Sequence, residues 1–307
     1  MVIPSEKEWS EWLVIEQGFV LTDRVLHELL IGGQTFQWHH PSPETDLWIG
    51  LLGNSLVQLR TDQNSGEVLF RSIGTKQPDA VREDLRQFFR LDEDHSAMLG
   101  TLPLDGDPYL ARCVERFPGL RILRQPIEEV LLTFLCSSNK QITQIRRMIG
   151  KLCERWGEEV YPGWFSYPQW KTLAEVNLDD LAACGTGYRG KYIFECARLL
   201  AEAPGFFTSL TATGYRDAKA ELMHLPGVGP KVADCILLYG GGYYESFPLD
   251  TWILKAMIHR YGKNQSTKRE MEAFASGYFG RYAGIAQQYI FAYEREVREL
   301  SGKKRIS

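Results

Sequence analysis

The stretch LPGVGPKVADCI, residues 225–236, decides the fold that we expect for this chain of 307 residues. Two glycines, Gly227 and Gly229, flank a valine, and glycine permits backbone conformations with φ > 0 and close approach of a partner. Pro230 follows at the first position of a helix, where proline is tolerated. With the helical patterns on either side, the stretch predicts a helix, a short turn and a second helix over roughly residues 215–240.

The predicted turn leaves the first backbone N–H groups of the second helix without partners, so they point out of the turn. A helix start of this kind binds an anion without using sequence information, and on DNA the anion is a backbone phosphate. The stretch is not a Walker A loop, because its glycine spacing differs and no Ser or Thr follows Lys231. It therefore predicts a DNA-binding helix-hairpin-helix, with a plain turn between two core helices as the alternative.

Lys231 lies in the first turn of the second helix, where the positive end of the helix dipole disfavours an ammonium. Such a lysine is a better amine nucleophile, and amines form Schiff bases with aldehydic carbons such as deoxyribose C1′. A lysine that only contacts a phosphate is the alternative. Asp250, in SFPLDTWILKAMIHRYG, precedes another helix, and we expect it to be an N-cap. Capping fixes its carboxylate, which can then stabilise positive charge on a sugar ring.

The overall charge carries no nucleic-acid signal, because it is −4 and any DNA-binding surface must therefore be local. The segment KQITQIRRMIGKLCERW contains such a local group of cations, and we expect about half of them to face solvent and the rest to contact phosphates. Its basic residues are Lys140, Arg146, Arg147, Lys151 and Arg155.

The six cysteines lie far apart and form no CxxC pair, so neither a zinc ribbon nor an iron–sulfur cluster is expected. No signal peptide precedes MVIPSEKEWSEW, and no apolar run reaches the ~18 residues of a membrane span. We therefore expect a reduced, soluble, intracellular protein that contacts no membrane.

The order of the predicted elements indicates an α+β fold. Residues 46–74 show β-branched and aromatic runs broken by Gly53-Asn54 and by Asn64-Ser65-Gly66, a pattern typical of hairpins in an antiparallel sheet. From about Pro78 the apolar residues change to a helical period. We expect an N-terminal antiparallel β-sheet subdomain over residues 1–77 and a mostly helical body, with the helix-hairpin-helix, over residues 78–307. Strands followed by helices argue against a doubly wound fold.

The hairpin together with the later PLD resembles the helix-hairpin-helix, lysine and aspartate of the 8-oxoguanine DNA glycosylase/lyase family. Four further segments are similar to family segments and occur in the family order, so the resemblance covers about residues 18–298. These are GGQTFQW (32–38), QPIEEVLLTFLCSSN (125–139), CGTGYRGKY (184–192) and YAGIAQQYIF (282–291).

The resemblance implies a role for each matching residue of the reaction site. Lys231 matches the Schiff-base nucleophile, and Asp250 matches the carboxylate that assists loss of the base. Gly33 matches the glycine whose carbonyl recognises the N7–H of 8-oxoguanine; a plain turn glycine is the alternative. Gln287 matches the residue that contacts the Watson–Crick edge of the base, and Phe291, one helical turn later, matches a residue that stacks on the flipped base. Simple core packing is the alternative for Phe291.

Cys235 matches a cysteine on the other side of the base pocket, with an inert buried thiol as the alternative. On the DNA side, Asn139 and Arg189 match residues that contact the cytosine left behind, with a helix C-cap and a surface ion pair as alternatives. Tyr188 matches a wedge that enters the duplex, which helps to offset the few kcal/mol of base extrusion. Gly227 and Gly229 match the hairpin that holds a DNA phosphate.

Two residues depart from the family pattern. Gln144 stands where the family often has a second cytosine-contacting arginine, which puts strict discrimination for an opposite cytosine in doubt. Trp252 stands where an imidazole commonly meets a phosphate, which puts that contact in doubt.

The resemblance implies a bifunctional DNA glycosylase and AP lyase that excises 8-oxoguanine, acting as a monomer on double-stranded DNA with an oxidised purine. This chemistry requires no metal and no organic cofactor, although a cation can bridge hairpin carbonyls to a phosphate. A glycosylase for another damaged base, such as an alkylated purine, is one alternative, but such enzymes use an activated water and have no lysine at this position. A non-enzymatic DNA-binding scaffold is another, and it needs no base pocket.

Overall fold

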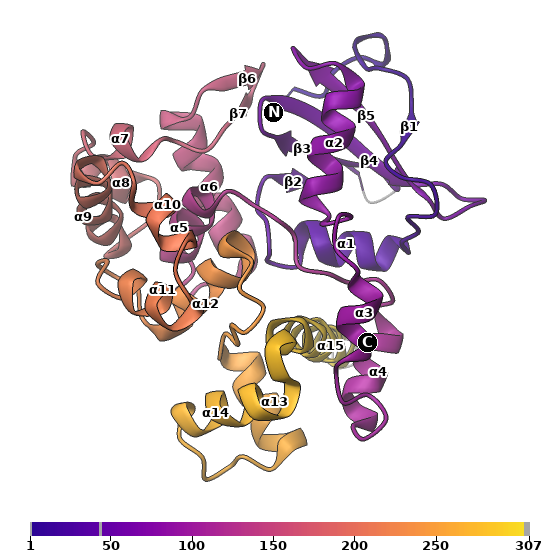
Figure 1. Ribbon diagram of the computed structural model, residues 1–307. Coiled ribbons are helices and arrows are strands. Elements are labelled where there is room, and N and C mark those ends of the chain that lie inside the picture. Colours follow the sequence, from indigo (N-terminus) through magenta and orange to yellow (C-terminus); the bar gives the residue numbers. More distant parts are fainter. Residues whose placement is uncertain (1, 43–44, 304–307) are drawn as a thin grey trace.

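The computed structural model describes residues 2–42 and 45–303, and it contains an N-terminal sheet followed by a mostly helical body (Figure 1). The sheet is antiparallel with strand order β1-β5-β4-β3-β2. Its strands are β1 (Leu13–Val14), β2 (Trp38–His39), β3 (Trp48–Leu52), β4 (Ser55–Thr61) and β5 (Val68–Gly74). The β3–β4 and β4–β5 hairpins turn at the two predicted glycine-containing sites, which confirms the expected α+β class.

Two helices accompany the sheet. Helix α2 (Pro78–Phe88) begins at the predicted change of period and packs against β5 (Figure 1). Helix α1 (Asp23–Ile31) was not predicted, although its buried residues Val25, Leu26, Leu29 and Leu30 have helical spacing and the Thr22 side chain caps it by accepting a hydrogen bond from Val25 N.

The remaining helices run from α3 to the long helix α15. They are α3 (His95–Gly100), α4 (Pro108–Arg116), α5 (Ile127–Leu135), α6 (Ile142–Trp156), α7 (Trp170–Leu173), α8 (Leu178–Ala183), α9 (Arg189–Glu202), α10 (Phe206–Thr211), α11 (Tyr215–Leu222), α12 (Pro230–Ile236), α13 (Thr251–Tyr261), α14 (Lys268–Phe279) and α15 (Ala283–Lys303). A π-helical turn, η2 (Leu237–Gly241), extends α12, and a small hairpin joins β6 (Glu159–Tyr161) to β7 (Trp164–Phe165).

Helix α5 is largely buried among other helices of the body. Its sequence IEEVLLTFL is apolar on most sides, and such a helix is stable only when it is surrounded by other elements. It packs against α9, α12 and η2, so the second helix of the hairpin rests on the core. The six cysteines are all free and buried, as expected of small apolar residues.

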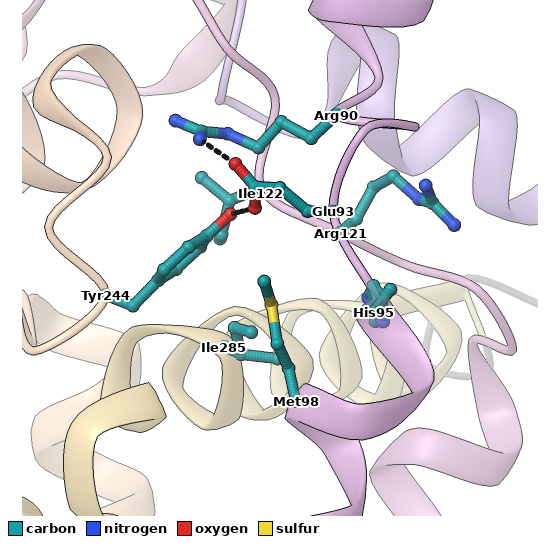
Figure 2. Close-up of a pocket in the computed structure, with 8 residues that line it drawn as sticks. All are labelled: Arg90, Glu93, His95, Met98, Arg121, Ile122, Tyr244 and Ile285. Carbon is teal, nitrogen blue, oxygen red and sulfur yellow. Dashed lines mark hydrogen bonds and ion pairs between the residues drawn. The ribbon is translucent and has the colours of Figure 1, made fainter.

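A partly buried ionic cluster joins the end of α2 to the loop that precedes α13 (Figure 2). Arg90 Nη1 donates to Glu93 Oε1 at 2.7 Å, and the Tyr244 hydroxyl donates to the same carboxylate. Gly242 has φ +73°, and a side chain there would meet the Arg90 guanidinium at 3.1 Å. Backbone contact continues from this loop to α15, where Gly284 N donates to Tyr244 O at 2.8 Å. The cluster therefore holds the approach to α13 against the N-terminal part of the chain.

Candidate active site

An open cleft of about 2100 Å³ lies where the hairpin, the α5–α6 connection, the start of α13 and the middle of α15 meet. It brings together residues from opposite ends of the sequence. The predicted site residues that line it are Gly33, Asn139, Tyr188, Gly227, Gly229, Lys231, Cys235, Asp250, Gln287 and Phe291.

The hairpin consists of α11, a turn and α12, at the place that the sequence predicts. Gly227 adopts φ +80°, and a Cβ there would lie 2.6 Å from the Tyr192 ring, so only glycine fits this corner. Gly229 is the extended N-cap of α12, with φ −92° and ψ 177°. A Cβ at Gly229 would meet open space. Close approach of a partner, rather than an unusual φ, is what this glycine permits.

Lys231 occupies the first turn of α12, directly after Pro230. Its Nζ lies 5.2 Å from the centroid of the Phe134 ring, which itself stacks on Tyr239 with centroids 5.4 Å apart. The amine therefore lies against the stacked rings of Phe134 and Tyr239, which form an aromatic wall of the cleft, at the start of α12. Phe134 and Tyr239 were not predicted as site residues. Phe134 lies in the segment QPIEEVLLTFLCSSN, which resembles a family segment, but the resemblance did not single out Phe134.

Cys235 lies one turn after Lys231 on the same helix and is buried. Burial raises the pKa of its thiol to about 11, although the charge of Lys231 and a hydrogen bond from it act in the opposite direction. The thiol is therefore protonated at neutral pH and is a weak nucleophile. This leaves it as part of the pocket wall.

Asp250 caps α13, as predicted. Its Oδ1 accepts hydrogen bonds from Trp252 N at 2.9 Å and Ile253 N at 2.8 Å. Burial raises the pKa of this carboxyl, while the two amide hydrogen bonds and the charge of Lys231 lower it. The cap fixes one carboxylate oxygen, and the electrostatic effect of Lys231 places the two side chains in one neighbourhood of the cleft.

The middle of α15 supplies a polar group and an aromatic ring on one face. Gln287 is 2% exposed and donates weakly through Nε2 to Pro248 O at 3.4 Å. Its Oε1 is buried and has no hydrogen-bond partner among the described residues. Phe291, one turn later, is half-buried and lines the cleft. A buried amide with an unpaired acceptor beside a half-buried aromatic ring suits a planar, polar ligand.

Gly33, from the N-terminal part of the chain, lines the same cleft as Gln287 and Phe291. It has φ +113°, and a Cβ there would come within 3.1 Å of Ile142 Cδ1. The next residue, Gln34, is buried; its Nε2 donates to Arg121 O and its Oε1 accepts from Leu123 N, each at 2.9 Å. Gln34 was not predicted as a site residue, although GGQTFQW contains it. It fixes the Gly33 turn to the segment before α5.

The three residues predicted to contact the DNA beside the lesion differ in exposure. Asn139 is exposed and adopts φ +53°, so it ends the chain segment after α5 in the left-handed conformation. Tyr188 is 55% exposed and lies over the Arg189 guanidinium, 4.4 Å from ring centroid to Cζ. Arg189 is 4% exposed and does not line the cleft: its guanidinium donates to the carbonyls of Ser138 and Thr186. The guanidinium of Arg189 is therefore held by backbone carbonyls inside the protein.

Comparison with known proteins agrees with this geometry. The family model "8-oxoguanine DNA glycosylase, N-terminal domain" matches residues 20–131, and "HhH-GPD superfamily base excision DNA repair protein" matches residues 132–279. The chain is 34% identical to a probable N-glycosylase/DNA lyase of Methanothermobacter thermautotrophicus, over 70% of this chain and 75% of that protein. It is 30% identical to the N-glycosylase/DNA lyase of Arabidopsis thaliana, over 89% of this chain and 77% of that protein.

The chain belongs to the 8-oxoguanine DNA glycosylase family. The crystal structure of the Clostridium acetobutylicum 8-oxoguanine glycosylase/lyase, in complex with DNA containing cytosine opposite 8-oxoguanine, superposes with a TM-score of 0.81 at 29% identity. The match covers 89% of this chain and 92% of that one, so the glycosylase fold extends over both the sheet and the helical body.

The two departures from the glycosylase pattern both lie on the cleft. Gln144 is exposed near the start of α6, where its Oε1 accepts from Gln141 N at 3.1 Å. Trp252 is flanked by two cations, with Arg298 Cζ 5.2 Å and Lys255 Nζ 5.8 Å from its ring centroid. An indole in this place positions neighbouring positive charge by cation–π contact but offers a phosphate only one N–H donor.

The basic segment of this glycosylase divides into structural and free cations. Arg146 donates to the carbonyls of Phe36 and Trp38, and burial lowers its pKa to about 10. Arg155 pairs with Asp180. Lys140 lines the cleft, while Arg147 and Lys151 are exposed.

Within the described parts of the chain, no cluster of three or more His, Cys, Asp or Glu side chains has the arrangement of a metal site. No helix of the described residues has the length and apolar composition needed to span a membrane.

Proposed function

We propose that this chain is a bifunctional DNA glycosylase and AP lyase that excises 8-oxoguanine from duplex DNA. The observation that carries the proposal is the placement of Lys231 on an aromatic wall, in the cleft that also holds the capped carboxylate of Asp250. Family membership supports the same reaction. We further propose that the protein works as a monomer, in the compartment that holds the cell's DNA.

The proposed reaction starts when the damaged base is extruded from the stack into the cleft. The lone pair of Lys231 Nζ attacks C1′ as the C1′–N9 bond breaks. Nζ loses a proton to solvent, and the base leaves with the bonding electrons and then gains a proton. The carboxylate of Asp250 stabilises the positive charge that the sugar carries during this exchange. Opening of the sugar ring converts the adduct to a Schiff base between C1′ and Nζ.

The Schiff base then supports cleavage of the strand. Loss of a proton from C2′ forms the C2′–C3′ double bond, the C3′–O bond breaks, and the 3′-phosphate leaves by β-elimination. Hydrolysis of the Schiff base frees Lys231. The steps use the amine of Lys231, the carboxylate of Asp250 and proton exchange with solvent, so no cofactor enters the proposed mechanism.

Base selection is proposed to come from two walls of the cleft, the turn at Gly33 and the face of α15 that carries Gln287 and Phe291. The Gly33 carbonyl accepts a hydrogen bond from N7–H, which 8-oxoguanine carries and guanine lacks, since N7 of guanine is itself an acceptor. Gln287 contacts the Watson–Crick edge with its free Oε1 and its weakly held amide, and Phe291 stacks on the ring. Cys235 closes the pocket as a neutral thiol.

The DNA strand is proposed to be held at the hairpin and at the rim. Gly227 and Gly229 present backbone N–H groups to a phosphate, Tyr188 fills the space left by the base, and Asn139 and Arg189 contact the orphaned cytosine. Gln144 carries no charge where the family often has an arginine, so we expect weaker preference for cytosine over other opposite bases.

Release of a specific base tests the proposal. Duplexes that carry 8-oxoguanine opposite cytosine, 3-methyladenine opposite thymine, or no lesion are incubated with the protein, and free bases and nicked strands are measured. We expect free 8-oxoguanine together with nicked strand. Release of the alkylated base alone would favour the alkylpurine alternative, and binding without release of any base would favour the scaffold.

A further inference from the structure

A buried ion pair connects the two walls of the proposed base pocket. Glu28, in the last turn of α1, is 3% exposed, and its Oε2 is bonded to Arg295 on α15. Arg295 lines the cleft and follows Phe291 by one helical turn and Gln287 by two, so the three side chains share one face of α15. Helix α15 therefore carries the base-contacting residues and the partner of Glu28 on the same side.

Glu28, the other member of the pair, contacts Gly32, the residue before Gly33. Gly32 N donates to Glu28 O at 2.9 Å, and a Cβ at Gly32 would lie only 2.3 Å from Glu28 Oε1. The carboxylate thus folds over the backbone of the Gly32–Gly33 turn, and glycine at position 32 makes room for it. Gln34 holds the far side of the same turn, so the turn is fixed from two directions.

Stability alone does not account for this pair. Burial raises the pKa of Glu28 to about 7, against the lowering effect of Arg295. Glu28 Oε1 and Arg295 Nε are buried and have no hydrogen-bond partner among the described residues. Apolar side chains in place of such a pair are often as stable or more stable, because the charges lose their hydration on burial. The pair joins the Gly32–Gly33 turn to α15, and this location indicates a positioning role rather than a stabilising one.

We propose that Glu28 and Arg295 are positioning residues, which hold the Gly33 carbonyl at a fixed distance from Gln287 and Phe291 and so keep the pocket matched to 8-oxoguanine. This inference rests on the proposed function. It concerns excision only, since nicking at a preformed abasic site requires Lys231 and DNA binding but places no base between the two walls.

The test compares two activities of the same variants. Single-turnover excision is measured on duplex with 8-oxoguanine opposite cytosine, and nicking is measured on the same duplex with an abasic site. The variants are Glu28→Gln, Arg295→Met and the double variant Glu28→Met/Arg295→Met, which leaves no unpaired buried charge if a single change prevents folding. The matched control is Arg24→Met, which breaks a second ion pair between α1 and α15, Arg24 Nε to Glu296 Oε1 at 3.3 Å, away from the turn.

We expect excision to fall about tenfold or more in all three pair variants, because small misplacement of reacting groups is costly, while abasic nicking stays within about twofold. Arg24→Met is expected to change neither activity. Wild-type ratios of excision to nicking in Glu28→Gln and in the double variant would overturn the inference. A wild-type protein that nicks abasic duplex but never releases 8-oxoguanine would instead refute the proposed function.

Discussion

Replacing Asp250 separates its two proposed roles, the helix cap and the catalytic charge. Asparagine keeps a side-chain oxygen that can accept from Trp252 N and Ile253 N, whereas alanine loses both bonds. Loss of an N-cap costs about 1 kcal/mol, so Asp250→Ala should be less stable than Asp250→Asn by roughly that amount. Since burial already disfavours the charged carboxylate, Asp250→Asn should be at least as stable as the wild type at neutral pH.

The catalytic cost follows from electrostatics. A unit negative charge about 4–6 Å from a developing positive charge is worth about 3–4 kcal/mol at an effective dielectric constant near 20. Loss of that stabilisation slows the reaction by about 10²- to 10³-fold. Both Asp250→Asn and Asp250→Ala should show this fall in excision, measured in single turnover with excess protein over duplex that contains 8-oxoguanine.

The assay pairs these rates with urea unfolding of the same preparations. Excision by Asp250→Asn within about threefold of the wild type would remove the carboxylate charge from the mechanism, since an electrostatic role predicts about 10²-fold or more. Equal loss of unfolding free energy in the asparagine and alanine variants would refute the capping argument.

Three further results are expected. Wild-type excision should fall as the pH drops through the raised pKa of Asp250, at a higher pH than an ordinary aspartate would give, and a pH–rate profile with Asp250→Asn as control checks this. Gly227→Ala should lose about 1–3 kcal/mol in urea unfolding, because the residue has φ +80° and faces the Tyr192 ring, whereas Gly229→Ala, whose Cβ meets open space, should stay within about 0.5 kcal/mol. Tyr188→Ala should slow excision with unfolding free energy unchanged within about 0.5 kcal/mol, since the side chain is exposed.

Local patterns account for the parts of the fold and site that could be predicted. The hairpin strands are marked by turn residues and the body by helical periodicity, and both are properties of neighbouring residues. Lys231 and Asp250 stand at helix starts that glycine, proline and aspartate indicate directly. Their placement in one cleft was a hypothesis from two helix starts, and the cleft contains both.

What the sequence left open depends on contacts between distant segments. Phe134 supports Lys231 across 97 positions, and Glu28 reaches Arg295 across 267, so no local pattern marks either pair. The sequence did not fix which of the two glycines takes the left-handed conformation, because glycine permits many conformations; Gly227 takes it, and Gly229 is the extended N-cap. The burial of Arg189 under Tyr188 likewise follows from the carbonyls that surround it.

Chemical trapping of Lys231 tests the central claim most directly. The protein is mixed with duplex that carries 8-oxoguanine, borohydride is added to reduce any Schiff base, and the adduct is located by peptide mass spectrometry. We expect a covalent adduct on Lys231 in the wild-type protein and none in Lys231→Gln, which should still bind the duplex. An adduct on another residue, or release of 8-oxoguanine by Lys231→Gln at the wild-type rate, would contradict the account.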